Sequence, residues 1–398
     1  MGKEDLNKDL LRAERSIGRI LNCEELLPEQ REELKRFDKH LKAEVKLTNT
    51  RRQYFVCLKQ LGKFLEKDYK SATRDDIEGF FVKMNGKKES TVFSWKVNIR
   101  TFYKWLLGVR EKGKYPDVVN YEVKKPSKVK IPKFLTEEEV KRMIEITDCI
   151  RDKCLLSVMY ESGCRRGEIA AINIGDVIFD KEVPVARFTV RDQEGCKRGS
   201  RPIILVNSVP VLREYINQHP GRNEKDSPLF ISFRRRGERL TTRGMNEVVK
   251  KYASQLDLEG IACHTFRHSR FRNLRQKGFS MLDMKQLGGW SQWDMVERYC
   301  RVADTKHIED KMLEINGFKS SKEEKKEEKL KPKVCLLCGT HNDSTNRICT
   351  KCNMPLNRDD LVEREQVTGD LVRRVIKLLP VLEKLEKLDY SETLESTR

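Results

Sequence analysis

Residues 287–291 read LGGWS, and a tyrosine follows the tryptophan of this stretch by nine positions, in ERYCR at 297–301. Two groups of charged residues lie upstream. HTFR at 264–267 contains a histidine and an arginine three positions apart, and SGCRRGE at 162–168 contains an arginine directly after a turn signal. Positions three apart share one face of a helix, so His264 and Arg267 are expected to reach the same bound group.

In chain order the set is Arg165, His264, Arg267, Trp290 and Tyr299, and it resembles the catalytic signature of the tyrosine recombinases, the phage integrase family. The resemblance is spread over separated motifs, which makes it far more specific than any one of them. It covers roughly residues 46 to 318. It implies a helical core-binding domain and a mainly helical catalytic domain with a small sheet, which together clamp DNA.

The residue types suit the cleavage of a DNA strand by a tyrosine. A phenol, with a pKa of about 10, attacks a phosphodiester, and extra negative charge develops on the non-bridging oxygens. Guanidinium groups suit that charge because each presents a planar fork of donors and is never deprotonated. Donors held in place before the reaction supply a large catalytic contribution, so neither a catalytic metal nor a nucleotide cofactor is expected.

By this resemblance, Arg165 and Arg267 hold the reacting phosphate, and His264 assists proton transfer at the tyrosine. Arg166 is the alternative to Arg165, and His268 is a neighbour in the same network. An isolated arginine at a helix start is more often a surface residue, and a lone histidine more often has a structural role. The order of the motifs is what favours the catalytic interpretation.

The resemblance implies three further catalytic residues. Lys197 lies in the polar turn QEGCKRG, residues 193–199, and would donate a proton to the leaving 5′-oxygen. Trp290 stands where many family members carry a histidine, and its indole N–H can donate to a phosphate oxygen but cannot accept a proton. Tyr299 is the expected nucleophile. The alternative for Lys197 is an exposed lysine of the turn, and the alternative for Trp290 is a tryptophan of the hydrophobic core.

Hydrophobic periodicity and changes in composition divide the chain into seven segments, and the resemblance implies the core-binding and catalytic roles of two of them. They are an N-terminal helical extension (1–45), a helical core-binding domain (46–114), a linker (115–132), a catalytic domain (133–318), a charged tether (319–333), a zinc ribbon (334–358) and a C-terminal helical segment (359–398). The fold class is mainly α with a small antiparallel sheet. That sheet is expected as a hairpin from the β-rich runs 185–190 and 201–206.

Four of the twelve cysteines form two Cys-x-x-Cys pairs, Cys335 with Cys338 and Cys349 with Cys352. Two such pairs can occupy the four corners of a tetrahedral site, which predicts one structural zinc ion. A redox dithiol is the alternative interpretation. The other eight cysteines are scattered singly, a usage that fits a reducing cytosol better than a disulfide framework.

The excess of basic residues indicates a polyanionic partner. The 398 residues include 81 lysines and arginines against 62 aspartates and glutamates, a net charge of +19, which favours nucleic acid. The resemblance implies that this partner is double-stranded DNA. No stretch approaches the roughly 18 apolar residues of a membrane span, and the N-terminus lacks the apolar core of a signal peptide. We therefore expect a cytoplasmic, nucleoid-associated protein with no membrane partner.

The sequence thus predicts a site-specific recombinase or integrase that cuts and rejoins DNA through a covalent 3′-phosphotyrosine, without ATP. The resemblance also implies a homo-tetramer on two paired DNA sites. An apolar segment at about 305–317 is expected to pack on a neighbouring subunit, and the alternative is that it folds back onto its own catalytic domain. Two other interpretations stay open. One is a type IB topoisomerase-like enzyme that relaxes DNA without pairing sites, and the other is a DNA-binding regulator of the same fold that has lost catalysis.

Overall fold

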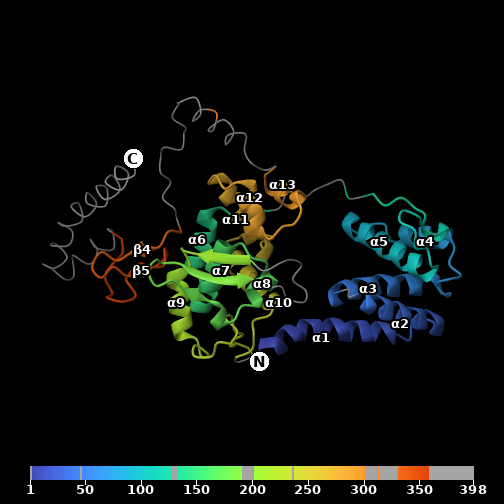
Figure 1. Cartoon of the computed structure of the whole chain (residues 1–398), viewed down its shortest axis with the longest axis horizontal. Helices are drawn as coiled ribbons and strands as arrows, with labels where there is room; N and C mark the ends of the chain where they lie inside the picture. The colour runs from blue at the N-terminus through green and yellow to red at the C-terminus, as the bar shows by residue number, and fades with distance from the viewer. Residues whose placement is uncertain are drawn as a thin grey trace. The chain divides into compact units, whose positions relative to one another are not determined.

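The computed structural model describes residues 2–44, 47–124, 126, 133–190, 201–234, 237–300, 312 and 330–357, without the side chains of 2–9 and 298–300 (Figure 1). The chain divides into two compact units, the first mainly from residues up to Pro132 and the second mainly from Lys133 onward. The segment at 359–398, all of 305–317 except Met312, and residues 319–329 of the predicted tether lie outside the described residues. Within the described ranges, no helix combines the length and apolar character that crossing a bilayer requires.

The first unit is all-helical in its described part. Its elements are α1 (Gly2–Leu21), α2 (Pro28–Ala43), α3 (Thr48–Leu65), α4 (Arg74–Lys83), α5 (Glu89–Leu106) and the 3-10 turn η1 (Asp117–Val119). Thr73 caps α4, because its hydroxyl accepts a hydrogen bond from the Asp76 N–H and its own N–H donates to the Asp76 carboxylate. The polar residues before the apolar pattern therefore determine where this helix begins.

One hydrophobic core runs through this unit and includes the first two helices. Phe37 of α2 is fully buried, and its ring centre lies 5.1 Å from that of Phe102 in α5 and 6.2 Å from that of Phe55 in α3. Residues 1–45 and 46–114, which the sequence analysis separated, therefore share one core. Periodicity identifies the apolar face of a helix but does not identify the helices that this face will meet.

The second unit is mainly helical around one small sheet, as the sequence predicted. Its helices are α6 (Glu137–Glu145), α7 (Ile150–Ser162), α8 (Arg166–Ala170), α9 (Val209–Gln218), α10 (Thr242–Ser254), α11 (Cys263–Gln276), α12 (Met281–Gly288) and α13 (Trp293–Cys300), with a 3-10 turn η2 (Ile174–Asp176). Helix α7 is the central element (Figure 1). It packs against α6, α9, α11 and the sheet, almost all of its residues are buried, and it leads directly into the SGCRRGE segment.

The sheet of the second unit is antiparallel, with the strands in the order β1 (Ile178–Phe179), β2 (Ala186–Val190) and β3 (Arg201–Leu205). Strands β2 and β3 form the predicted hairpin, and Val190 pairs with Arg201 at the end next to residues 191–200. Alternate residues of both strands are buried, so one face of the sheet packs on the core. Strand β1 was not predicted, because two residues are too few to show an alternation.

The cysteine-rich segment forms a small ribbon with its own two strands, β4 (Lys333–Val334) and β5 (His341–Asn342). Within the second unit, the ribbon contacts α7. Lys153 Nζ donates to Asn346 Oδ1 at 2.8 Å and lies 3.5 Å from the buried carboxylate of Asp343. Because Lys153 is in the first turn of α7, the ribbon contacts the end of this helix that is opposite to the SGCRRGE segment.

Replacing Phe37 by alanine tests the shared core of the first unit. The change leaves a cavity between α2, α3 and α5, so the free energy of unfolding of this unit should fall by about 3–5 kcal/mol, as urea unfolding followed by tryptophan fluorescence would measure. Val82→Ala is the control, because Val82 is 74% exposed. If Phe37→Ala destabilises no more than this control, α2 does not belong to the core.

Candidate active site

The segment between α7 and α8 is a tight turn that presents Arg165. Gly163 ends α7 with a φ of +56°, and a Cβ there would come within 3.2 Å of the Phe271 ring, so both conformation and space favour glycine. Arg165 follows as the N-cap residue of α8. Its backbone N–H and its Nη1 both donate to the Glu168 carboxylate, each at 2.8 Å. The guanidinium is held in one direction while 29% of the side chain stays exposed.

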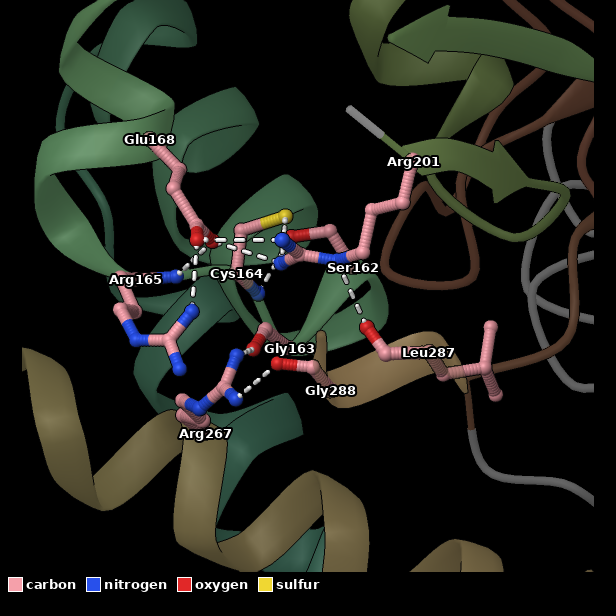
Figure 2. A network of polar contacts seen from close by, with 9 residues as sticks. All are labelled: Ser162, Gly163, Cys164, Arg165, Glu168, Arg201, Arg267, Leu287 and Gly288. Carbon is pink, nitrogen blue, oxygen red and sulfur yellow. Dashed lines mark hydrogen bonds and ion pairs between the residues drawn. The ribbon is translucent and has the colours of Figure 1, made fainter. Parts of the chain in front are cut away.

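Glu168 is buried and binds a second arginine. Arg201, the first residue of β3, donates from Nη2 to Oε2 at 2.7 Å and from Nη1 to Oε1 at 3.1 Å (Figure 2). Burial by itself raises the pKa of Glu168, but the hydrogen bonds and charges of Arg201 and Arg165 outweigh this effect and lower the pKa to about 2. The carboxylate is therefore ionised at neutral pH and holds both guanidinium groups.

Arg267 of α11 connects the turn before Arg165 with the end of α12. Its Nη1 donates to the Gly163 carbonyl at 2.6 Å, and its Nη2 donates to the Gly288 carbonyl at 2.7 Å (Figure 2). The side chain is only 2% exposed, and its guanidinium carbon lies 5.0 Å from the ring centre of Trp290.

His264 lies in the first turn of α11, three residues before Arg267, as the sequence predicted. Its side chain is exposed, and its ring stacks with that of His268 at a centroid distance of 5.8 Å. The protein around it removes part of its water shell, which lowers its pKa, and the charges of Arg267, Arg166 and Arg165 lower the pKa further. A neutral imidazole can accept a proton, which suits a group that assists the deprotonation of a tyrosine.

The tryptophan of LGGWS belongs to a small core. Trp290 is 4% exposed and packs against Phe271, with 4.5 Å between the ring centres. A Cβ on Gly288 would come within 2.6 Å of the indole, and Gly289 ends α12 with a φ of +59°. The glycine pair therefore allows the chain to bring the indole under the end of α12. This burial fits the core interpretation of Trp290, and its role as a phosphate donor stays a prediction.

Two of the expected catalytic side chains lie outside the part of the chain that the structure describes. The backbone of Tyr299 is in α13, which packs against α11 and α12, but its side chain is among those not described. Lys197 belongs to residues 191–200, which connect the paired residues Val190 and Arg201. The roles of Tyr299 and Lys197 therefore stay predictions.

The structure adds Arg201 to the site, a residue that the sequence analysis did not single out. The expected residues that it brings together are Arg165, His264, Arg267 and Trp290. The alternation of residues along β3 contained a signal for Arg201, because Arg201 lies on the buried face of this strand together with Ile203 and Leu205. A charged residue at such a position needs a buried partner, and the strand pattern does not identify that partner.

Comparison with known proteins identifies the family. Residues 133–306 match the phage integrase family. Tyrosine recombinase XerA from Pyrococcus furiosus is 30% identical over 293 residues, which cover 72% of this chain and 94% of that protein. The chain is a tyrosine recombinase of the phage integrase family. Enzymes of this family cleave and rejoin DNA.

Further relatives of this recombinase agree with the assignment. Tyrosine recombinase XerC from Herpetosiphon aurantiacus is 26% identical, over 70% of this chain and 92% of that protein. Among solved structures, XerH site-specific recombinase bound to a palindromic difH substrate has a TM-score of 0.55 at 18% identity, covering 76% of this chain and 95% of that one. A lambda integrase dimer bound to a COC′ core site has a TM-score of 0.54 at 16% identity, covering 69% and 78%. At these identities the structures establish the fold.

The ribbon lies outside the residues matched to the family, and it brings four cysteines together. Cys335 Sγ lies 3.5 Å from Cys352 Sγ, and Cys338 Sγ lies 3.6 Å from Cys349 Sγ. All four sulfur atoms lie within 4.8 Å of one another. Sulfur atoms at about 2.3 Å from a tetrahedral zinc ion are about 3.8 Å apart, so this arrangement fits the metal.

An NMR titration tests the electrostatics at His264. Its ring should titrate with a midpoint below about 6.5, the ordinary value, because the loss of part of its water shell and the nearby arginines oppose protonation. The resonance is assigned by its loss in His264→Gln. In Arg166→Met one of the repelling charges is gone, so the midpoint should move up. A midpoint above the ordinary value, or one that does not respond to Arg166→Met, would show that these charges do not surround the ring.

Proposed function

We propose that this recombinase cuts double-stranded DNA at a specific site, with Tyr299 as the nucleophile and with Arg165 and Arg267 holding the reacting phosphate. The observation that carries the proposal is the bond from Arg267 to the Gly163 carbonyl, which ties the second arginine to the turn two residues before the first. Two guanidinium groups from distant segments thus converge on one place. Donors preorganised in this way are what a phosphodiester transition state requires.

In the proposed reaction, the Tyr299 oxygen attacks the phosphorus and the 5′-oxygen of the next nucleotide leaves, which produces a 3′-phosphotyrosine. Neutral His264 assists removal of the phenolic proton, and Lys197 donates a proton to the leaving oxygen. Trp290 packs beside Arg267 and directs its indole N–H to the phosphate. Rejoining reverses these steps, because a 5′-hydroxyl attacks the phosphotyrosine and no ATP is needed.

Double-stranded DNA is the proposed partner, and a homo-tetramer on two paired sites is the proposed working assembly, in the cytoplasm and on the nucleoid. The net charge of +19 supports a polyanionic partner. The similar structures of XerH and lambda integrase were solved with a difH substrate and a COC′ core site, which supports the same class of partner for this chain.

The two alternative functions have less support. The similar proteins are named as recombinases or integrases, which favours site-specific recombination over the relaxation of supercoils by a type IB topoisomerase-like enzyme. Arg165, His264, Arg267 and Tyr299 are all present in the chain. A regulator that had lost catalysis would have no need for this set.

We further propose that the ribbon holds one structural zinc ion through Cys335, Cys338, Cys349 and Cys352. The sulfur spacing supports this proposal. A redox dithiol would require only two of the four thiols, whereas a tetrahedral ion uses all of them. Because two knuckles close around one ion, the metal would hold the short strands β4 and β5 in register.

Replacing Tyr299 by phenylalanine tests the nucleophile. The substrate is a nicked suicide duplex that carries the site selected by the parent protein from random-sequence DNA. The parent should form a covalent adduct, visible on a denaturing gel, and Tyr299→Phe should bind equally well but form none. Arg165→Lys keeps the charge but loses the fork, so adduct formation should slow by about 10²–10³-fold, while Arg166→Lys, the matched control, stays near the parent. An adduct in Tyr299→Phe would place the nucleophile elsewhere.

Metal analysis tests the ribbon. Protein purified under reducing conditions should contain about one zinc per chain, and the double variant Cys335→Ser/Cys338→Ser should contain none, because two of four ligands are lost. Cys149→Ser, which changes a cysteine outside the ribbon, should keep the metal. Zinc-free protein whose ribbon cysteines form a disulfide on air oxidation would instead support the redox dithiol.

A further inference from the structure

Arg201 contacts two other segments of the active site, the SGCRRGE segment and the end of α12. Its Nη1 and Nη2 hold the Glu168 carboxylate, its Nε donates to the Leu287 carbonyl at 2.9 Å, and its Nη2 lies 3.8 Å from Cys164 Sγ (Figure 2). The side chain is 7% exposed. Every nitrogen of this guanidinium therefore has a partner within the protein.

Each contact of Arg201 leads to a part of the proposed reaction. Glu168, its main partner, also binds the backbone N–H and the guanidinium of Arg165. The Leu287 carbonyl is near the end of α12, which precedes the tyrosine-bearing helix α13. The backbone of Arg201 directly follows residues 191–200, to which Lys197 belongs. One side chain thus links the carboxylate that holds the first arginine to the helix that precedes the tyrosine-bearing helix.

The end of α12 requires partners of this kind. The last carbonyl groups of a helix have no intrahelical donor and carry the negative end of the helix dipole. Arg201 binds the Leu287 carbonyl and Arg267 binds the next one, that of Gly288. A Cβ at Gly289 would come within 2.8 Å of Arg201 Nη1, so a glycine, which has no Cβ, leaves space for the guanidinium at this position. Two arginines from different elements therefore hold consecutive carbonyl groups of one helix end.

We propose that Arg201 is a positioning residue, which sets the distance between Arg165 and the end of α12 without touching DNA. This inference rests on the proposed catalytic role of Arg165. A guanidinium suits the task because it presents a parallel pair of donors to the carboxylate and a further donor, Nε, to the carbonyl. A lysine keeps the charge but lacks this rigid fork. The competing explanation is an ion pair that stabilises the fold and does nothing for the reaction.

The test compares Arg201→Lys with the parent in three measurements. They are thermal unfolding, the Kd for a duplex that carries the site selected by the parent from random-sequence DNA, and the rate of adduct formation on the nicked form of that duplex at saturating DNA. We expect the rate to fall by about 10²-fold, because misplacing a catalytic group by about 1 Å has an effect of this size. The Kd should stay within about twofold of the parent value, since an interaction outside the DNA contact does not change ground-state binding.

The matched control is Arg187→Lys, which changes an exposed arginine of the neighbouring strand β2 that also binds a carboxylate, that of Asp180. It should cleave at the parent rate. A variant without any cation, Arg201→Met, leaves Glu168 buried with one partner fewer and can fail to fold. The double variant Arg201→Met/Glu168→Gln removes the buried charge and keeps an acceptor for Arg165, so it should fold and still cleave slowly.

Two results would overturn the proposal. If Arg201→Lys, measured below its melting temperature, forms the adduct within about threefold of the parent rate, Arg201 is only a stabilising ion pair. If the Kd weakens as much as the rate falls, Arg201 acts in DNA binding instead. Failure of the proposed function is a different result, because the parent protein itself would then form no adduct on a DNA site that it binds.

Discussion

The buried ion pair between Arg201 and Glu168 is the interaction on which the arrangement of the site depends. Moving two charged groups out of water costs several kcal/mol for each, and the bidentate contact together with the bonds from Arg165 to the same carboxylate offsets this cost. A pair of this kind adds little net stability, yet removing one partner costs about 3–5 kcal/mol. Its main effect is therefore to specify which segments meet, since any arrangement that separates the two residues leaves a buried charge alone.

Backbone carbonyl groups at two helix ends complete the same arrangement. Helices α7 and α12 both end at a glycine in the left-handed conformation, Gly163 and Gly289. Arg267 binds the carbonyl of Gly163 at the first end and that of Gly288 at the second. Because the bonds satisfy groups that lack intrahelical partners, the two helix ends are joined without burying unpaired polar atoms.

Trp290 affects which residues can carry out the proton transfers of the proposed reaction. An indole can donate a hydrogen bond but cannot accept a proton, so acid–base chemistry in the proposed reaction depends on His264 and Lys197. The lowered pKa of His264 keeps its imidazole neutral and able to accept. Trp290 instead contributes packing, because its ring lies against Phe271 and beside the guanidinium of Arg267. A buried aromatic surface at this place restricts the directions that Arg267 can adopt.

The sequence by itself determined the family, the mainly helical character of both units, the hairpin of β2 and β3, and the grouping of the four ribbon cysteines. Each of these depends on residues that are close in the chain or on spacings that are repeated along it. His264 and Arg267 were placed on one helix for the same reason, because they are three positions apart.

Only the tertiary structure decided that Arg201 faces Glu168 across 33 positions, that α1 and α2 share a core with α3 and α5, and that Trp290 is buried beside Arg267. Local periodicity shows that a position is buried, but it carries no information about the segment that will cover it. The partner of a buried charge and the packing of an apolar face depend on which distant segments meet, and that is settled when the whole core forms.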